Sequence, residues 1–292
     1  MRGKMGMNYY KVKKIHDWLF TIYDPIGVYC YLIVGKKHAL LVDTGHGIEP
    51  LDPYIREITT LPYSVVLTHG HWDHAGGAFE FKQVWMNAKD IDIYYRQMVP
   101  ETRKHILTTY AEVLRDNGVV LCEDTYINVD TFTEGDEITL AHLEDNHLFD
   151  LGGITVQMVD MAAHTPGSVG ALVVEHGLLL VGDATAKNCW MFLEDTMPMP
   201  VYIKMLKRIA AMDIKFFHFS HEHDFFPGAD FEGMIRVAEN IDPCRAKRYE
   251  YKFDTLGGYI YTEGEYSIVF DPKKLRWAST FDNKYTEYFD PL

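Results

Sequence analysis

The chain has 292 residues, of which 47% are hydrophobic and 24% are charged, a composition typical of a globular protein with a sizeable core. Its formal net charge of −14 argues against a protein that binds nucleic acid or an anionic membrane surface, because those partners favour a basic face. Residues 1–14 lack the apolar stretch of a secretory signal, and no apolar run is long enough to span a bilayer. We therefore expect a cytoplasmic protein, and the composition leaves its oligomeric state open.

The cysteines are far apart in the sequence and form no C-x-x-C pair: Cys30, Cys122, Cys189 and Cys244. Neither a disulfide framework nor a thiolate zinc site is indicated by this spacing. Ordinary packing is their expected role.

Short apolar runs bounded by turn residues predict strands along most of the chain. They fall at residues 28–34, 38–45, 63–70, 154–160, 170–175, 177–184 and 215–220. Helical patterns precede or separate several of them, at residues 49–58, 88–118 and 199–212. This alternation indicates an α/β fold.

Two segments share one plan, in which an apolar strand, a charged turn and a second apolar strand lead to an aspartate beside a glycine. Residues 31–45 deliver Asp43 in this way, and residues 171–184 deliver Asp183. The similarity suggests that the fold contains two related sheet halves. However, β-hairpins resemble one another in general, and this general resemblance explains the similarity equally well.

The pattern divides the chain into a main domain over residues 1–244 and a C-terminal β extension over residues 245–292. The extension is rich in tyrosine, alternates polar with apolar residues and reads as a β-meander packed on the core. Within the main domain, residues 88–135 form a long and mainly helical insertion that could cap a pocket.

The stretch LTHGHWDHAGG, residues 67–77, directly follows a predicted strand and concentrates metal-competent side chains. His69, His71, Asp73 and His74 offer the imidazole and carboxylate groups that zinc, iron and manganese accept. A chance polar loop with this spacing is improbable, so the cluster predicts a metal site.

Three further candidate ligands each lie just past a predicted strand, where a loop can direct a side chain to a shared centre: His164, Asp183 and His221. Taken singly, each is a weak signal and reads better as an ordinary turn or loop residue. Together with the cluster they make seven nitrogen and oxygen ligands, which is too many for one tetrahedral ion and suits two ions that share a carboxylate.

At this point the sequence resembles the metallo-β-lactamase-fold hydrolases, particularly their glyoxalase II-like and lactonase-like branch. The motifs that carry the resemblance stand in the family's order: LVDTG (41–45), THGHWDHAGG (68–77), AHTPGSVG (163–170), LLVGDA (179–184) and SHEH (220–223). The resemblance implies an αβ/βα four-layer sandwich, in which two mixed β-sheets pack face to face between helices and the metal site lies at one edge.

The resemblance also implies a ligand set for each of two metal ions. His69, His71 and His164 would bind the first ion, Asp73, His74 and His221 the second, and Asp183 would bridge them. Zinc is the expected metal, with iron or manganese as alternatives. Asp43 matches a family aspartate that organises the site through hydrogen bonds.

The sequence departs from the family pattern at two of these motifs. Ala162 and Ala163 precede His164 where proline and glycine are usual, and Ser220 precedes His221 where glycine is common. Because His218 and His223 lie close by, either is an alternative to His221 as the last ligand. His46, after the DTG motif, is expected in a solvent-facing loop rather than in contact with substrate.

Two divalent ions would lower the pKa of a water molecule between them from about 16 to near neutrality, so the chain needs no serine or cysteine nucleophile. The expected enzyme is a dinuclear hydrolase whose metal-bridging hydroxide attacks an ester, thioester or lactone carbonyl of a small molecule. Asp73 combines a ligand role with proximity to that water and is the predicted proton acceptor. No G-x-S-x-G motif or P-loop supports a competing chemistry.

The main alternative is a mononuclear iron dioxygenase of the persulfide dioxygenase type, which keeps the histidine motif with fewer ligands. A non-catalytic binding module would be expected to lack ligands, and all seven are present. The substrate pocket is less defined: aromatic and apolar residues at 190–192, with Tyr94, Tyr95 and Tyr110, either line it or pack under a loop. The basic segment 245–252 either holds an anionic substrate tail or faces water.

Overall fold

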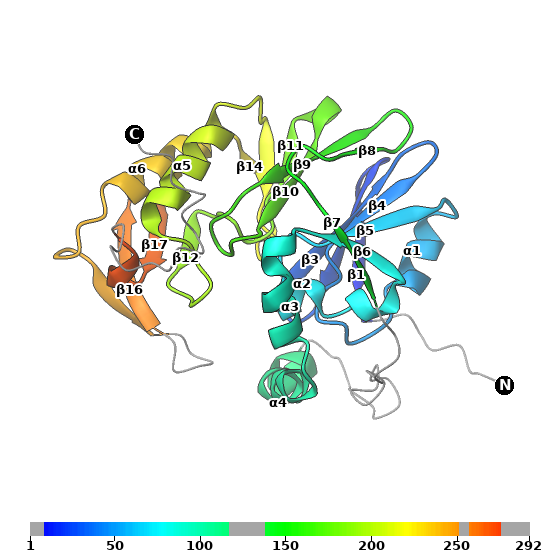
Figure 1. Cartoon of the computed structure of the whole chain (residues 1–292), viewed down its shortest axis with the longest axis horizontal. Helices are drawn as coiled ribbons and strands as arrows, with labels where there is room; N and C mark the ends of the chain where they lie inside the picture. Colours follow the sequence, from blue (N-terminus) through cyan, green and yellow to red (C-terminus); the bar gives the residue numbers. More distant parts are fainter. Residues whose placement is uncertain (1–8, 117–137, 251–256, 276–292) are drawn as a thin grey trace.

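The computed structural model describes residues 9–116, 138–250 and 257–275. Two mixed β-sheets lie back to back with helices on their outer faces, and a third, smaller sheet lies at one end of the molecule (Figure 1). The predicted four-layer sandwich is confirmed by this arrangement.

The first sheet contains seven strands in chain order. Its first four strands are antiparallel, and β4 to β7 run parallel to one another. The strands are β1 (Lys11–His16), β2 (Leu19–Asp24), β3 (Val28–Val34), β4 (Ala39–Val42), β5 (Tyr63–Val66), β6 (Gln83–Met86) and β7 (Thr139–His142).

The second sheet contains six strands, and only β11 and β13 pair in parallel. The order across the sheet is β14 (Phe226–Pro227), β13 (Phe216–His218), β11 (Leu178–Leu180), β10 (Val169–Val173), β9 (Thr155–Asp160) and β8 (Leu148–Asp150). A one-turn helix, η4 (Val174–His176), connects β10 to β11. Both hairpins predicted at residues 31–45 and 171–184 are present, since β3 pairs with β4 and β10 with β11, each pair antiparallel.

Alternation of side chains explains why the two sheets pack on each other. In β4, Leu40 and Val42 lie in the core between the sheets, whereas Leu41 faces the opposite way, into the core beneath the helices of the first sheet. In β11, Leu178 and Leu180 enter the same inter-sheet core. Each strand is apolar on both faces because both faces are covered.

Helices cover the outer faces. On the first sheet lie α1 (Asp52–Ile58), α2 (Trp72–Ala75), η1 (Ala78–Glu80), η2 (Ala88–Asp90) and α3 (Ile91–Gln97), and α4 (Pro100–Asp116) extends beyond α3 (Figure 1). The described part of the predicted insertion is therefore helical, as expected, and residues 117–137 lie outside the described residues. On the second sheet, α5 (Met199–Ala210) and α6 (Asp230–Glu239) pack on Leu179 and Phe217.

The third sheet joins the C-terminal strands to a strand from the middle of the chain. Its order is β12 (Asn188–Met191), β17 (Tyr266–Phe270), β16 (Gly257–Glu263) and β15 (Lys247–Glu250), followed in the chain by η5 (Pro272–Lys274). The predicted meander is formed by β15, β16 and β17, and its parallel pairing with β12 places the extension against α6.

All seven predicted strands and the helices near residues 52 and 199 are present in the structure. The sequence reading missed the edge and short strands β1, β2, β6, β7, β8, β12 and β14, and the helices α2 and α6. In the described residues no helix has the length and apolarity needed to cross a membrane.

Candidate metal centre

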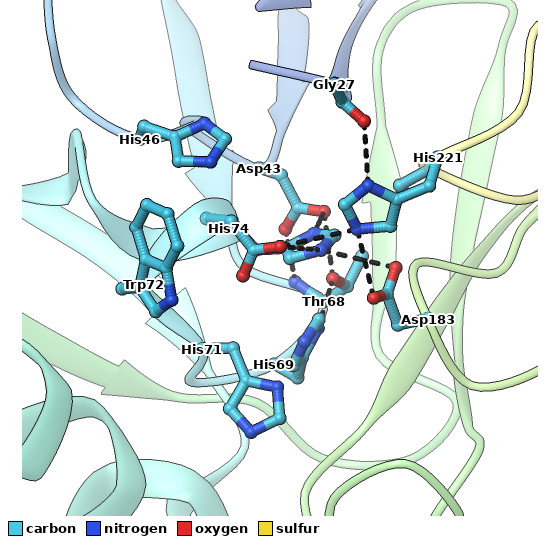
Figure 2. A network of polar contacts seen from close by, with 12 residues as sticks. Gly27, Asp43, His46, Thr68, His69, His71, Trp72, His74, Asp183 and His221 are labelled. Atoms are coloured by element: carbon cyan, nitrogen blue, oxygen red, sulfur yellow. Dashed lines mark hydrogen bonds and ion pairs between the residues drawn. The ribbon is translucent and has the colours of Figure 1, made fainter. Parts of the chain in front are cut away.

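The predicted ligands meet at one edge of the two sheets, where β5, β9, β11 and β13 end. His69, His71, Asp73 and His74 follow β5, and the last two lie on the short helix α2. His164 follows β9, Asp183 follows β11 and His221 follows β13. Figure 2 shows His69, His74, Asp183 and His221 directed toward one another from these separate segments. All seven residues are thus brought together.

A first group consists of three buried histidines, His69, His71 and His164, whose ligand atoms all lie within 4.8 Å of one another. Nδ1 of His71 is 3.0 Å from Nε2 of His164. Nε2 of His69 is buried with no hydrogen-bond partner among the described residues. A buried ring nitrogen without a partner costs free energy, so this group fits a cation better than it fits an empty site.

A second group of equally close ligand atoms contains Asp73, His74, Asp183 and His221. Nε2 of His221 lies 3.3 Å from Oδ2 of Asp73 and 3.1 Å from Oδ2 of Asp183. Nε2 of His74 lies 3.2 Å from Oδ1 of Asp183 and 3.7 Å from Oδ2 of Asp73. Two carboxylates therefore face two imidazoles, a donor set that divalent zinc, iron and manganese accept.

Asp183 adjoins both groups. Besides its contacts with His74 and His221, its Oδ2 lies 3.9 Å from Nε2 of His164 in the first group. The preceding residue, Gly182, has φ +53°, and a Cβ there would come within 2.6 Å of the Thr68 hydroxyl. Glycine at this position therefore lets the segment between β11 and Asp183 approach the loop that carries His69.

Asp43 orients residues of the site through hydrogen bonds and is absent from both ligand groups, as predicted. It is fully buried and accepts hydrogen bonds from the backbone N–H and the hydroxyl of Thr68, at 2.7 and 2.8 Å. It also lies 2.8 Å from Nδ1 of His74. Because Nδ1 donates to this carboxylate, Nε2 is the nitrogen of His74 that would offer its lone pair to a metal ion in the second group once the ring is neutral.

The structure distinguishes the three histidines near residue 220. His221 directs Nε2 at Asp73 and Asp183 while its Nδ1 lies 2.7 Å from the carbonyl oxygen of Gly27. His218 instead pairs with the hydroxyl of Tyr31 at 2.7 Å, and His223 pairs with that of Tyr29 at 2.6 Å. Only His221 of the three joins the second group.

The two groups have opposite electrostatic character. Burial and neighbouring imidazoles lower the pKa of His69, and burial lowers that of His164 to about 4, so these two histidines of the first group present neutral nitrogens. Burial also opposes the charge on His74, yet Asp183, Asp73 and Asp43 outweigh it and raise its pKa to about 10. The carboxylates of the second group are thus stabilised by a nearby positive charge, which protons or a metal ion can supply.

A cavity of about 710 Å³ opens onto both groups. Beyond the candidate ligands, its walls come from the loops after β4 and β11, from β12, and from α3 and α4. Trp190 and Tyr110 line it, whereas Met191, Phe192 and Tyr94 are buried in packing and Tyr95 is exposed. The aromatic segments therefore divide between lining and packing, except for Tyr95, which has neither role.

His46 lies differently from its prediction. Only 6% of the residue is exposed, and it lines the cavity rather than a solvent-facing loop. Its ring packs edge-on against Trp72, with centroids 4.4 Å apart, and near Tyr110. The prediction was wrong because α2 and α4, which cover this loop, are remote from it in sequence.

Two acidic residues that contact this site were missed by the sequence reading. Asp24, at the end of β2, lies 3.0 Å from Nδ1 of His46. Asp195, in the loop between β12 and α5, lies 3.5 Å from Nε2 of His71 and 2.6 Å from the Arg96 guanidinium on α3. Each is a single carboxylate with no motif around it, so the sequence carried no signal for either.

Known proteins resemble this chain over much of its length. It is 26% identical over 170 residues to a probable metallo-hydrolase, YqgX, from Bacillus subtilis, covering 57% of this chain and 70% of the relative. It is 24% identical over 153 residues to a hydroxyacylglutathione hydrolase, GloC, from Haemophilus influenzae, covering 51% and 61%. It is 24% identical over 196 residues to the human acyl-coenzyme A thioesterase MBLAC2, covering 61% and 67%.

Solved structures agree on the fold. A metallo-beta-lactamase from Pontibacter korlensis superposes with a TM-score of 0.55 at 16% identity, covering 80% of this chain and 100% of that one. The sequence profile of the Metallo-beta-lactamase superfamily matches residues 23–221, which is more than half of the chain. The chain therefore belongs to the metallo-beta-lactamase superfamily, as its motifs predicted.

Proposed function

We propose that this protein is a dinuclear metal-dependent hydrolase that cleaves an ester, thioester or lactone bond of a small molecule. The observation that carries the proposal is the pair of adjacent ligand groups with Asp183 next to both. A site built for one ion would need only one of these groups.

The chain's own residues fit two divalent cations, zinc in the first place. His69, His71 and His164 would hold one ion, and Asp73, His74 and His221 the other, with Asp183 shared between them. Ions bound there would polarise a carbonyl oxygen and lower the pKa of a water molecule enough to supply hydroxide near neutral pH.

Asp73 is the proposed proton acceptor. It lines the cavity, and its carboxylate is partly accessible from it. Burial tends to raise the pKa of Asp73, but the neighbouring His74 and His221 lower it below its usual range. The ionised carboxylate can therefore accept a proton from a water molecule or pass one to a leaving group.

The similar proteins support this choice of bond. One relative is named an acyl-coenzyme A thioesterase and another a hydroxyacylglutathione hydrolase. A third, 24% identical over 162 residues, is named a probable zinc-dependent hydrolase of polyketide biosynthesis. Thioesters and related acyl compounds are therefore the first substrates to test, and cavity size is consistent with a small molecule.

The test is metal content per chain, measured for zinc, iron and manganese in purified protein, together with hydrolysis of an ester, thioester and lactone panel. We expect about two ions per chain and hydrolysis of at least one class. His221→Gln should lose about one ion and most activity, whereas His223→Gln, altered two residues away, should keep both.

A single iron per chain that persists in His221→Gln would contradict the dinuclear proposal. It would instead favour the mononuclear iron dioxygenase, which consumes dioxygen in the presence of a persulfide. The shared role of Asp183 would then be wrong.

A further inference from the structure

A histidine in the loop after β4 pairs with a carboxylate at the end of β2, and neither residue belongs to the two ligand groups. His46 lies in this loop and Asp24 at the end of β2, and both are buried. Figure 2 shows His46 above Trp72, to the left of the central ligand residues. The cavity that opens onto the ligand groups is lined by His46 as well.

The carboxylate of Asp24 is fully occupied by hydrogen-bond donors. Its Oδ1 accepts from the Tyr9 hydroxyl at 2.8 Å and from the backbone N–H of Ile26 at 3.0 Å. Its Oδ2 accepts from the backbone N–H of His46 at 3.2 Å and lies 3.0 Å from the Nδ1 of that ring. This network fixes the carboxylate, and the carboxylate fixes the ring.

Backbone conformation contributes to the pairing. Gly45, directly before His46, has φ +65°, and a Cβ there would lie 3.1 Å from Oδ2 of Asp24. Glycine therefore allows the loop to turn tightly against the carboxylate. The result is a histidine backed by a buried acid, held by contacts from β2, the N-terminal segment and its own loop.

The pairing determines which ring nitrogen of His46 carries the hydrogen atom. Both oxygens of Asp24 face hydrogen-bond donors, from the Tyr9 hydroxyl and from the backbone N–H groups of Ile26 and His46, so the carboxylate is ionised and accepts from the ring as well. In neutral His46 the hydrogen therefore sits on Nδ1, and Nε2 keeps its lone pair. Nδ1 is committed to Asp24, so Nε2 is the polar atom that the ring offers to the cavity.

A packing role alone does not account for this arrangement. Burying a carboxylate is costly unless it is fully hydrogen-bonded, and an apolar residue would fill the space beside Trp72 without that cost. Carboxylates that orient an imidazole are typical of rings that must present one nitrogen in a defined state.

We propose that His46 is a substrate-binding residue whose Nε2 accepts a hydrogen bond, so the preferred substrate carries a hydroxyl or N–H donor near its scissile carbonyl. The identity of that carbonyl rests on the proposed hydrolase function. The donor requirement rests on the His46–Asp24 pair and the shared cavity.

The kinetic test uses zinc-loaded protein with phenyl esters of 2-hydroxybutanoic and 3-hydroxybutanoic acid, each compared with phenyl butanoate. We expect one hydroxyl ester to show a kcat/KM about 5- to 20-fold above that of phenyl butanoate. His46→Asn keeps a donor toward Asp24 but removes the Nε2 acceptor, so this preference should vanish while metal content stays unchanged.

Two further variants separate binding from structure. His46→Gln places an amide oxygen near the position of Nε2 and should recover part of the preference. His105→Asn changes an exposed histidine of α4 that lines the same cavity and has no carboxylate partner among the described residues, and it should keep the whole preference. A preference that survives in His46→Asn, or is absent in the wild type, would overturn the proposal.

A binding test is independent of turnover. The ¹⁵N resonance of Nε2 of His46 is followed as 3-hydroxybutan-2-one or 4-hydroxybutan-2-one is added to the zinc-loaded protein, with butan-2-one as the control. A shift with a hydroxyketone but not with butan-2-one supports the donor requirement even if no ester is hydrolysed, in which case only the hydrolase proposal fails. Equal responses to all three ketones would reject the role of His46.

Discussion

Thr68 links the two ligand groups through a single hydroxyl. Its hydrogen is donated to Oδ2 of Asp43 at 2.8 Å, and its oxygen lies 3.0 Å from Nδ1 of His69. The hydroxyl has one hydrogen, so it can only accept from His69. That contact places the hydrogen of the His69 ring on Nδ1 and leaves Nε2 free for a metal ion.

Replacing this hydroxyl with a methyl group of similar shape tests the link. Thr68→Val should weaken zinc binding about 10- to 100-fold and lower the free energy of unfolding of the metal-free protein by about 1 to 3 kcal/mol. Competition with a chromophoric chelator measures the first quantity, and denaturant unfolding measures the second.

The matched control is Thr21→Val, which removes a buried hydroxyl in β2 with one long contact, 3.4 Å, to the carbonyl oxygen of Lys13. Zinc affinity should be unchanged in this control. Equal zinc affinity in Thr68→Val and the wild type would show that Asp43 alone orients the site.

At the scale of residues, motif spacing was sufficient to find every member of both ligand groups. The H-x-H-x-D-H stretch is local, and His164, Asp183 and His221 each follow a strand, where the chain must turn at the sheet edge. Their roles as ligands stay predictions. Asp24 could not be found, because its importance comes from contacts with residues 15 and 22 positions away.

At the scale of elements, two segments hold the loop that carries Asp195. Arg96 on α3 contacts its carboxylate directly at 2.6 Å. The Lys274 ammonium on η5 donates to the carbonyl oxygens of Leu193, Glu194 and Thr196 in the same loop. The helical insertion and the C-terminal extension thus both stabilise the position of a carboxylate that faces His71.

Asp195→Asn tests whether this carboxylate orients a ligand. The amide keeps the size of the side chain but loses the charge that attracts the second ring nitrogen of His71, so zinc affinity should fall about 10-fold. Isothermal titration of the metal-free protein with zinc provides the readout. Glu194→Gln neutralises the adjacent exposed side chain and should leave the affinity unchanged. If both variants bind zinc as the wild type does, the 3.5 Å contact between Asp195 and His71 has no orienting role.

Elements were predictable where local patterns decide them and were missed where distant pairing does. The strands β3, β4 and β10 are apolar runs buried on both faces along most of their length, so their sequences are distinctive. By contrast, β1 is exposed at nearly every position and reads as a polar segment. In β12, residues 188–191 pair with residues 267–270, and no local signal reveals a partner so far along the chain.

At the scale of the whole molecule, the chain has a formal net charge of −14, and negative charge is also concentrated locally around the second ligand group. Asp73, Asp183 and Asp43 surround His74, and together they raise its pKa to about 10 from an ordinary 6.5 despite its burial. The metal-free fold therefore holds a proton at a position where the metal-loaded fold would hold a cation. Stability and metal binding should consequently respond to pH in opposite directions.

The sign follows from the raised pKa of His74. Protonated His74 stabilises the metal-free fold fully below about pH 6.5, and this stabilisation is lost progressively as the pH rises through about 10. The Tm of the metal-free protein should therefore fall between about pH 6.5 and pH 9, by roughly 2 to 4 °C for each kcal/mol lost. Zinc must displace that proton, so the increase in Tm on adding zinc should grow over the same range.

Scanning calorimetry at several pH values, with and without zinc, measures both trends. His74→Gln removes one of the two histidines whose pKa these carboxylates raise, the other being His221, and should make the metal-free profile less steep, while His223→Gln should retain the wild-type slope. Because tyrosines with raised pKa values also titrate above pH 9, the comparison between variants within the stated range isolates His74. A wild-type profile that rises toward pH 9, or a slope that is identical in His74→Gln, would show that His74 is neutral in the metal-free fold and that the carboxylates are compensated elsewhere.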